Sequence, residues 1–228
     1  MLSPAEWQAV RLTLLVACTA VVASLPLGVL AGWLLAKREF PGKLLVETLL
    51  NLPLVLPPVV TGYFLLVVFG RHGMIGAYLE SWLGLRFVFD WKGAALAAAV
   101  MGFPLLVRPI RVAFAGVDDG LLAAARTLGA GPFDAFWSVA LPLARRGIFG
   151  GCTLAFARSM GEFGATIMIA GSIPGQTRTM TLHIYETLSG GGIEQTQGLI
   201  VASVIIAAGA LLVCEYFERR GRQEQNRT

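Results

Sequence analysis

The segment 117–147 reads VDDGLLAAARTLGAGPFDAFWSVALPLARRG and separates two apolar stretches of the chain. Asp118 or Asp119 is a favourable N-cap, so the alanine-rich residues 121–128 are predicted to form a short helix. Gly129 is expected to end this helix, because glycine adopts helix-terminating backbone conformations at little cost. The first half of the segment is therefore predicted to be a short helix outside the apolar stretches.

A second short helix is predicted to begin at Pro132, since proline is favoured at the first helical position, and to end at Leu141-Pro142. Aromatic residues at positions i, i+3 and i+4 share one face of this helix: Phe133, Phe136 and Trp137. Large aromatic side chains are costly in water, so this face needs either a groove on a partner protein or the surface of a lipid bilayer. The pattern alone leaves both possibilities open.

The composition around this segment is that of a membrane protein. Of 228 residues, 56% are hydrophobic and only 14% are charged, and the mean hydropathy is +0.70. Soluble domains carry about 25% charged residues, so an ordinary soluble enzyme and a disordered chain are both excluded. The predicted fold class is an all-α membrane protein without a sizeable soluble domain.

Histidines and cysteines give no sign of a metal site or a disulfide scaffold. Cys18, Cys152 and Cys214 all lie in apolar runs, and we predict that they are small buried hydrophobic residues. His72 and His183 are isolated and lie outside the predicted spans, and His72, beside Arg71 in an outside loop, is predicted to be a surface residue. We therefore expect no metal and no cofactor, and no nucleophile–base pair inside the membrane that would indicate an intramembrane enzyme.

Five apolar runs are long enough to be membrane spans, since crossing a hydrocarbon core of about 30 Å takes about 20 residues. They cover approximately residues 12–36, 48–70, 93–115, 147–171 and 195–217. The chain is thus predicted to be a single transmembrane domain, 1–228, with an intervening loop at 118–146. An odd number of spans places the two termini on opposite sides of the membrane.

Positive charge indicates which terminus is inside, because basic residues accumulate in cytoplasmic loops. With the N-terminus outside, the cytoplasmic segments hold ten basic residues: Lys37, Arg38, Lys43, Arg126, Arg145, Arg146, Arg219, Arg220, Arg222 and Arg227. The outside loops between the spans then hold four: Arg71, Arg86, Lys92 and Arg178. We therefore predict an outside N-terminus and a cytoplasmic C-terminus. The basic residues flank spans and form no stripe, which disfavours a nucleic-acid partner.

Prolines interrupt the second predicted span, which contains NLPLVLPPVVTGY at residues 51–63. Pro57 and Pro58 each remove a backbone donor, and Thr61 and Gly62 follow three and four residues after Pro58. Broken helices occur in membranes where protein or a water-filled cavity satisfies the freed carbonyls. The cluster predicts either a discontinuous helix that lines a transport pathway or a kink that serves packing.

The fourth predicted span carries ARSMGEFGATIMIAG at residues 157–171. Arg158 and Glu162 are four residues apart, so on one helix they share a face and can form an ion pair. The pair is predicted either to fix helix packing or to act as a gate, because intramembrane charges are costly and face protein or water. The same stretch offers a surface of small residues where another helix can approach closely: Gly161, Gly164, Ser159, Ala165 and Thr166.

Two arginines lie close to the predicted cytoplasmic end of the third span. Arg108 and Arg111 can extend toward the interface, which accounts for both without further assumptions. The alternative is that they attract anions at the inner mouth of a pathway.

The loop 118–146 resembles the cytoplasmic "EAA" loop, E-A-A-x3-G-x9-I-x-L-P, of the membrane subunits of binding-protein-dependent ABC importers. The matching residues are Ala124, Ala125, Gly129, Val139, Leu141 and Pro142. The sequence departs from the motif at Ala123, where the family has glutamate. The resemblance implies a type I importer fold in which residues 129–142 form a coupling helix that docks on an ATPase subunit. Phe133, Phe136 and Trp137 would then transmit its motion.

The resemblance narrows to the molybdate permease family in four segments: NLPLVLPPVVTGY, AARTLGAG, LAFARSMGEFGATIMIAG and IPGQTRTM. It implies a bacterial inner-membrane subunit of an ATP-driven oxyanion importer. The implied partners are two ATPase subunits, a periplasmic oxyanion-binding protein and a second copy of the chain. Sulfate and tungstate permeases are similar in the same segments. Thr61, Gly62, Ser159 and Thr166 are candidate donors along the pathway.

No phosphate-binding loop of the Gly-x4-Gly-Lys-Ser/Thr type occurs in the sequence, so the chain is not expected to hydrolyse ATP. The rival from another class is an ion-coupled secondary transporter, which needs no aromatic docking loop. Such transporters usually show internal repeats, and the sequence shows none.

Overall fold

The computed structural model describes residues 2–71, 73–192, 196–210 and 212, and in this part of the chain every regular element is helical. The first helix, α1 (Pro4–Lys37), has 34 residues and is about 51 Å long at 1.5 Å per residue. A capping box starts it: the Ser3 hydroxyl accepts from the Glu6 N–H at 3.3 Å, and the Ser3 N–H donates to the Glu6 carboxylate at 2.6 Å.

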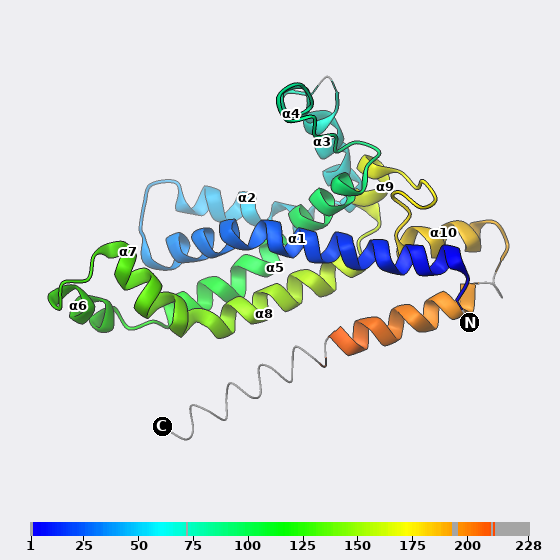
Figure 1. Ribbon diagram of the computed structural model, residues 1–228. Helices are drawn as coiled ribbons and strands as arrows, with labels where there is room; N and C mark the ends of the chain where they lie inside the picture. Colours follow the sequence, from blue (N-terminus) through cyan, green and yellow to red (C-terminus); the bar gives the residue numbers. More distant parts are fainter. Residues whose placement is uncertain (1, 72, 193–195, 211, 213–228) are drawn as a thin grey trace.

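The centre of the molecule is a bundle of α1, α5 (Trp91–Ala115) and α8 (Leu141–Met160), which pack along one another (Figure 1). Glycines permit their close approach. A Cβ atom on Gly32 of α1 would lie 2.5 Å from Ile110 of α5, and one on Gly151 of α8 would lie 2.5 Å from the Leu106 carbonyl. The bundle is therefore held by close backbone packing as well as by buried apolar side chains.

The second predicted span is two helices, α2 (Lys43–Val55) and α3 (Pro58–Phe69), whose axes are bent by 114°. Leu56 and Pro57 are extended between them, and Pro58 takes the first position of α3. The discontinuity expected from the proline cluster therefore lies at Leu56-Pro57. α2 packs against α5, and Figure 1 shows α3 turning away from the bundle.

The fourth predicted span is also interrupted. α8 ends at Met160, residues 161–163 are non-helical, and α9 (Gly164–Ala170) follows. Two further helices lie between the predicted spans, in segments for which the sequence predicts no helix: α4 (Gly76–Leu83) and α10 (Met180–Ser189).

Among the described residues, α1 and α5 are long and apolar enough to cross a membrane, and the bent pair α2 and α3 would make a third span. Thr196–Ala210 is a shorter apolar helix that begins near α1, where Leu199 is fully buried. The five-span count and the orientation of the termini stay predictions.

The prediction that the cysteines are buried was wrong for two of them. Cys18 is exposed and Cys152 is half-buried, while Cys214 lies outside the described residues. Cys18 lies on the outward face of α1, where apolar side chains such as Val22 and Leu15 are also exposed. An apolar residue in a membrane helix can face lipid as well as the protein core, and hydropathy does not distinguish the two.

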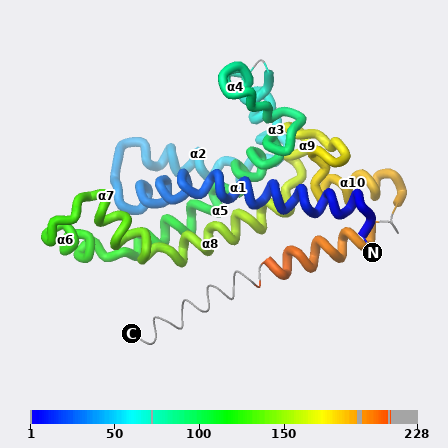
Figure 2. Tube along the Cα trace, in the orientation of Figure 1, coloured from blue at the N-terminus to red at the C-terminus, as the bar shows by residue number. Residues whose placement is uncertain are grey.

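The loop 118–146 forms the end of the molecule opposite the N-terminus (Figure 2). α6 (Asp119–Thr127) is capped by Asp118, whose carboxylate accepts from the Gly120 N–H at 2.7 Å. Gly129 follows with a left-handed backbone, φ 93°. The first predicted helix and its terminating glycine are thus confirmed.

The second predicted helix, α7 (Pro132–Ala135), begins as expected at Pro132, but it does not end at Leu141-Pro142. A π-helical turn, Phe136–Ala140, joins it directly to α8. The Leu141 N–H donates to the Phe136 carbonyl five residues back, and this wider turn accommodates Pro142, which has no N–H to donate. The proline marks a change of helix register rather than a helix end.

Candidate functional site

The two helix breaks meet in space because α3 packs against α9. A Cβ on Gly164, at the start of α9, would lie 2.8 Å from the Pro58 Cβ at the start of α3. A Cβ on Gly62 would lie 2.7 Å from the Cα and the carbonyl oxygen of Ala165. The small residues predicted to form a close-packing surface therefore bring two broken helices together.

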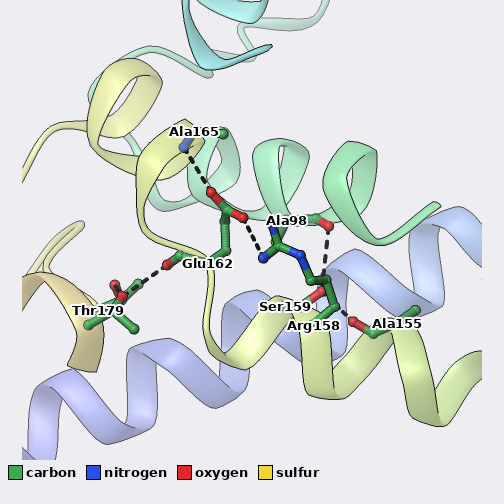
Figure 3. Close-up of polar contacts among 8 residues, drawn as sticks. Ala98, Ala155, Arg158, Ser159, Glu162, Ala165 and Thr179 are labelled. Atoms are coloured by element: carbon green, nitrogen blue, oxygen red, sulfur yellow. Dashed lines mark hydrogen bonds and ion pairs between the residues drawn. The ribbon is translucent and has the colours of Figure 1, made fainter. Parts of the chain in front are cut away.

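Arg158 and Glu162 form the predicted ion pair, with 2.7 Å between the Arg158 Nη1 and the Glu162 Oε2 atoms (Figure 3). Its geometry differs from the prediction, because Glu162 lies beyond the end of α8 rather than on the same helix face. The other carboxylate oxygen, Oε1, accepts from the Ala165 N–H at 2.8 Å. Glu162 therefore links the last turn of α8 to the first turn of α9 across the break.

Further hydrogen bonds hold the break in place. The Thr181 hydroxyl of α10 donates to the Glu162 carbonyl at 2.9 Å and lies 3.0 Å from the Thr179 hydroxyl. The Met180 N–H donates to the Thr13 hydroxyl of α1 at 2.8 Å. Glu162 itself is only 3% exposed, so its charge is compensated almost entirely by protein.

The polar candidates for a pathway differ in what their hydroxyls contact. Ser159 donates to the Ala155 carbonyl at 2.8 Å, within its own helix, and Thr166 is buried in α9. Thr61 is 7% exposed, and its hydroxyl has no hydrogen-bond partner in the described part of the chain. Thr61 is therefore the candidate with unused hydrogen-bonding capacity beside the two breaks.

We predict that Gly62→Ala weakens the contact between α3 and α9. The added methyl would lie 2.7 Å from Ala165, so the helices must separate, and such overpacking costs about 1–3 kcal/mol. Thermal unfolding in detergent measures the loss. Gly150→Ala is the matched control, because a Cβ there meets nothing within 4 Å and the position is helical. Equal melting temperatures for the two variants would contradict close packing at Gly62.

At the opposite end of the molecule, the three residues of the predicted aromatic face differ in their exposure to solvent. Phe133 is 75% exposed and Trp137 54% exposed, and their ring centroids are 6.0 Å apart. Phe136 is half-buried, with ring centroids 5.2 Å from Trp33 of α1, 6.0 Å from Phe114 of α5 and 6.0 Å from Trp137. The three rings are neighbours along the segment, as predicted, but Phe136 also packs against the ends of α1 and α5, so Phe133 and Trp137 form the exposed pair.

The other residues of the predicted coupling loop surround these aromatics. Ala124 and Pro142 are exposed, whereas Ala125 and Leu141 are half-buried against the apolar core below them. Lys37 at the end of α1 holds the loop in place: its ammonium donates to the Val117 carbonyl and to the Asp119 carboxylate, each at 2.6 Å. Sequence reasoning missed this contact and the role of Trp33, although a lysine at a helix end and an Asp-Asp pair were visible in the sequence.

The N-terminal end of the bundle carries a surface depression of about 450 Å³. It is lined by polar residues of α1, of the start of α5 and of the IPGQTRTM segment: Gln8, Arg11, Asp90 and Gln176 among them. His183 on α10 is half-buried, and His72 lies outside the described residues. Among the described residues, no group of His, Cys, Asp and Glu could hold a metal ion.

Sequence comparisons relate almost the whole chain to transport proteins. The family model described as "Binding-protein-dependent transport system inner membrane component" matches residues 24–220. The molybdenum transport system permease protein ModB of Escherichia coli (strain K12) is 50% identical over 228 residues, 100% of both chains. ModB of Haemophilus influenzae is 46% identical over 216 residues, 94% of both chains. The sulfate transport system permease protein CysW of Synechocystis is 34% identical over 212 residues, 93% of this chain and 76% of CysW.

Solved structures share the fold at much lower sequence identity. A bacterial ABC transporter that imports the acidic polysaccharide alginate matches with a TM-score of 0.75 and 16% identity, covering 96% of this chain and 80% of the other. The MetNI methionine ABC transporter in an inward-facing conformation matches with a TM-score of 0.66 and 18% identity, covering 94% and 93%. The helical arrangement is therefore that of ABC importer membrane subunits.

Proposed function

The chain belongs to the family of binding-protein-dependent transport system inner membrane components, and we propose that it is the permease subunit of an ATP-driven molybdate importer. The observation that carries the proposal is 50% identity to ModB of Escherichia coli over the full length of both chains. Identity to the sulfate permease CysW is lower, at 34%, which favours molybdate over sulfate.

In this proposal the transport pathway runs past the point where the two broken helices pack against each other. Five spans cross the bacterial inner membrane with the N-terminus outside and the C-terminus cytoplasmic. Two copies of the chain enclose one pathway between them, and the breaks at Pro57 and Gly161 lie along it. Two groups lie beside these breaks and change their contacts when the helices move: the Arg158–Glu162 pair, and Thr61, whose hydroxyl has no hydrogen-bond partner among the described residues.

Energy comes from a separate pair of ATPase subunits that bind the cytoplasmic end of the molecule. The exposed pair Phe133 and Trp137 contacts an ATPase groove, while Phe136 joins the coupling segment to α1 and α5. A periplasmic oxyanion-binding protein delivers molybdate at the opposite end. The chain itself binds the anion weakly, because a pathway that holds its cargo tightly cannot release it.

Reconstitution tests the proposal directly. We expect vesicles that hold the chain with its ATPase, supplied with binding protein, to take up molybdate only when ATP is present. Molybdate should stimulate ATP turnover more than sulfate does, with tungstate as the chemically closest comparison. Uptake by vesicles that lack the ATPase would instead support an ion-coupled secondary transporter, and stimulation by sulfate alone would support a sulfate permease.

A further inference from the structure

Two polar contacts join α2 to α5 in the half of the bundle nearer the loop 118–146. Arg111 pairs with Glu47, with 2.9 Å between the Nη2 and Oε1 atoms. One helical turn away, the Arg108 Nε donates to the Asn51 side-chain carbonyl at 2.8 Å. The two contacts have the same architecture, but only the first pairs a cation with an anion.

Asn51 orients Arg108 without neutralising it. The Asn51 amide donates to the Glu47 backbone carbonyl at 2.6 Å, which fixes its oxygen toward Arg108. Among the described residues this contact uses only the Nε–H of the guanidinium, which leaves the four N–H donors on its two terminal nitrogens. Within the described part of the chain, no carboxylate forms an ion pair with Arg108.

The position of Arg108 along α5 indicates that its positive charge is functional. Arg108 lies seven residues from the end of α5 and Asn51 eight residues into α2, which places their contact about 10–12 Å from both helix ends. Val107 and Ile110 on either side are buried, whereas Arg108 is exposed beside α2. An uncompensated charge is costly inside a membrane and is usually functional there.

We propose that Arg108, held by Asn51, is a transient contact for the tetrahedral oxyanion as it passes through the inner half of the pathway. The proposal rests on the proposed function, molybdate transport. A guanidinium matches the geometry of oxyanions through parallel N–H donors, and a neutral acceptor keeps its full positive charge available. Arg111, which is neutralised by Glu47, serves to join the helices.

The chemistry that recognises a molybdate ion would also recognise a lipid phosphate, so the test must separate these two sources. ATP-dependent molybdate uptake is measured for the complete complex in vesicles of phosphatidylcholine alone and of phosphatidylcholine with phosphatidylglycerol. Asn51→Asp neutralises Arg108 in place, and Arg108→Gln removes the charge. Co-purification with the ATPase verifies that both variants assemble.

We expect each variant to lower uptake at least about tenfold in both lipids, the factor that loss of one charge-assisted hydrogen bond implies. The matched control is the double variant Glu47→Gln with Arg111→Gln, which removes the neighbouring ion pair without changing net charge and should lower uptake by clearly less than tenfold, because a partly exposed ion pair contributes about 1 kcal/mol or less. Unchanged uptake by Asn51→Asp and Arg108→Gln would overturn the inference, and so would a loss confined to vesicles with phosphatidylglycerol. If the parent complex itself takes up no molybdate, the proposed function fails instead.

Discussion

Replacing Phe133 and Trp137 together by alanine is expected to abolish co-purification of the chain with its ATPase subunit, while the chain still folds. Both side chains are more than half exposed, so truncation removes little packing within the chain. Aromatic anchors at the centre of an interface contribute about 2 kcal/mol or more each. Losing two of them weakens binding by a factor of about a thousand, at 1.4 kcal/mol per tenfold.

The control for this experiment is a second exposed aromatic pair at a distant location. Tyr78 and Trp82 on α4 are 70% and 85% exposed, and their double alanine variant should co-purify normally. Phe136→Ala should behave differently from both, because Phe136 packs against Trp33 and Phe114 and its loss lowers the melting temperature. Normal assembly of the Phe133 and Trp137 variant would exclude these residues as the docking anchors.

The second large effect is expected at the Arg158–Glu162 pair. Reversing either charge alone leaves the other charge without a partner and next to a like charge, and breaking a buried pair costs about 3–5 kcal/mol. That is a large part of the stability of a typical protein, so we expect little folded protein from Arg158→Glu or from Glu162→Arg. Fluorescence-detected size-exclusion chromatography of detergent extracts measures the folded yield.

The double reversal is expected to restore only part of that yield. It recreates an ion pair, but an arginine at position 162 cannot accept the hydrogen bond that Glu162 receives from the Ala165 N–H. Reversal of Glu80, which is paired at 2.7 Å with the exposed Arg86, should cost less than about 1 kcal/mol and serves as the control. Complete restoration by the double variant would show that the helix-capping contact contributes nothing.

Local signals in the sequence predicted local structure well. The cap at Asp118, the left-handed Gly129, the helix start at Pro132 and the interruption next to Pro57 all lie where residue chemistry placed them. Each depends on a residue and its immediate neighbours in the chain, and tertiary packing does not override them.

What the sequence could not predict depends on partners far along the chain. Phe136 packs against Trp33 and Phe114, and neither could be placed beside it from spacing alone. The hydrogen bond between Asn51 and Arg108 depends on the packing of α2 against α5, which sequence spacing does not predict. Likewise, the helix continues through Pro142 because of a π-helical turn, which proline statistics do not reveal. The docking and pathway roles of these residues stay predictions.

The continuous helix through Pro142 has a mechanical consequence. The helix axis changes direction between α7 and α8 (Figure 1), so the helix consists of a short arm and a long arm. The short arm consists of the 4 residues of α7 and the 5 residues of the π-helical turn and is about 13 Å long. The long arm is the 20-residue α8, which is about 30 Å long. Because the helical backbone is continuous from Pro132 to Met160, a displacement of Phe133 and Trp137 would be carried along one helix to Arg158, beside the break that begins at Gly161.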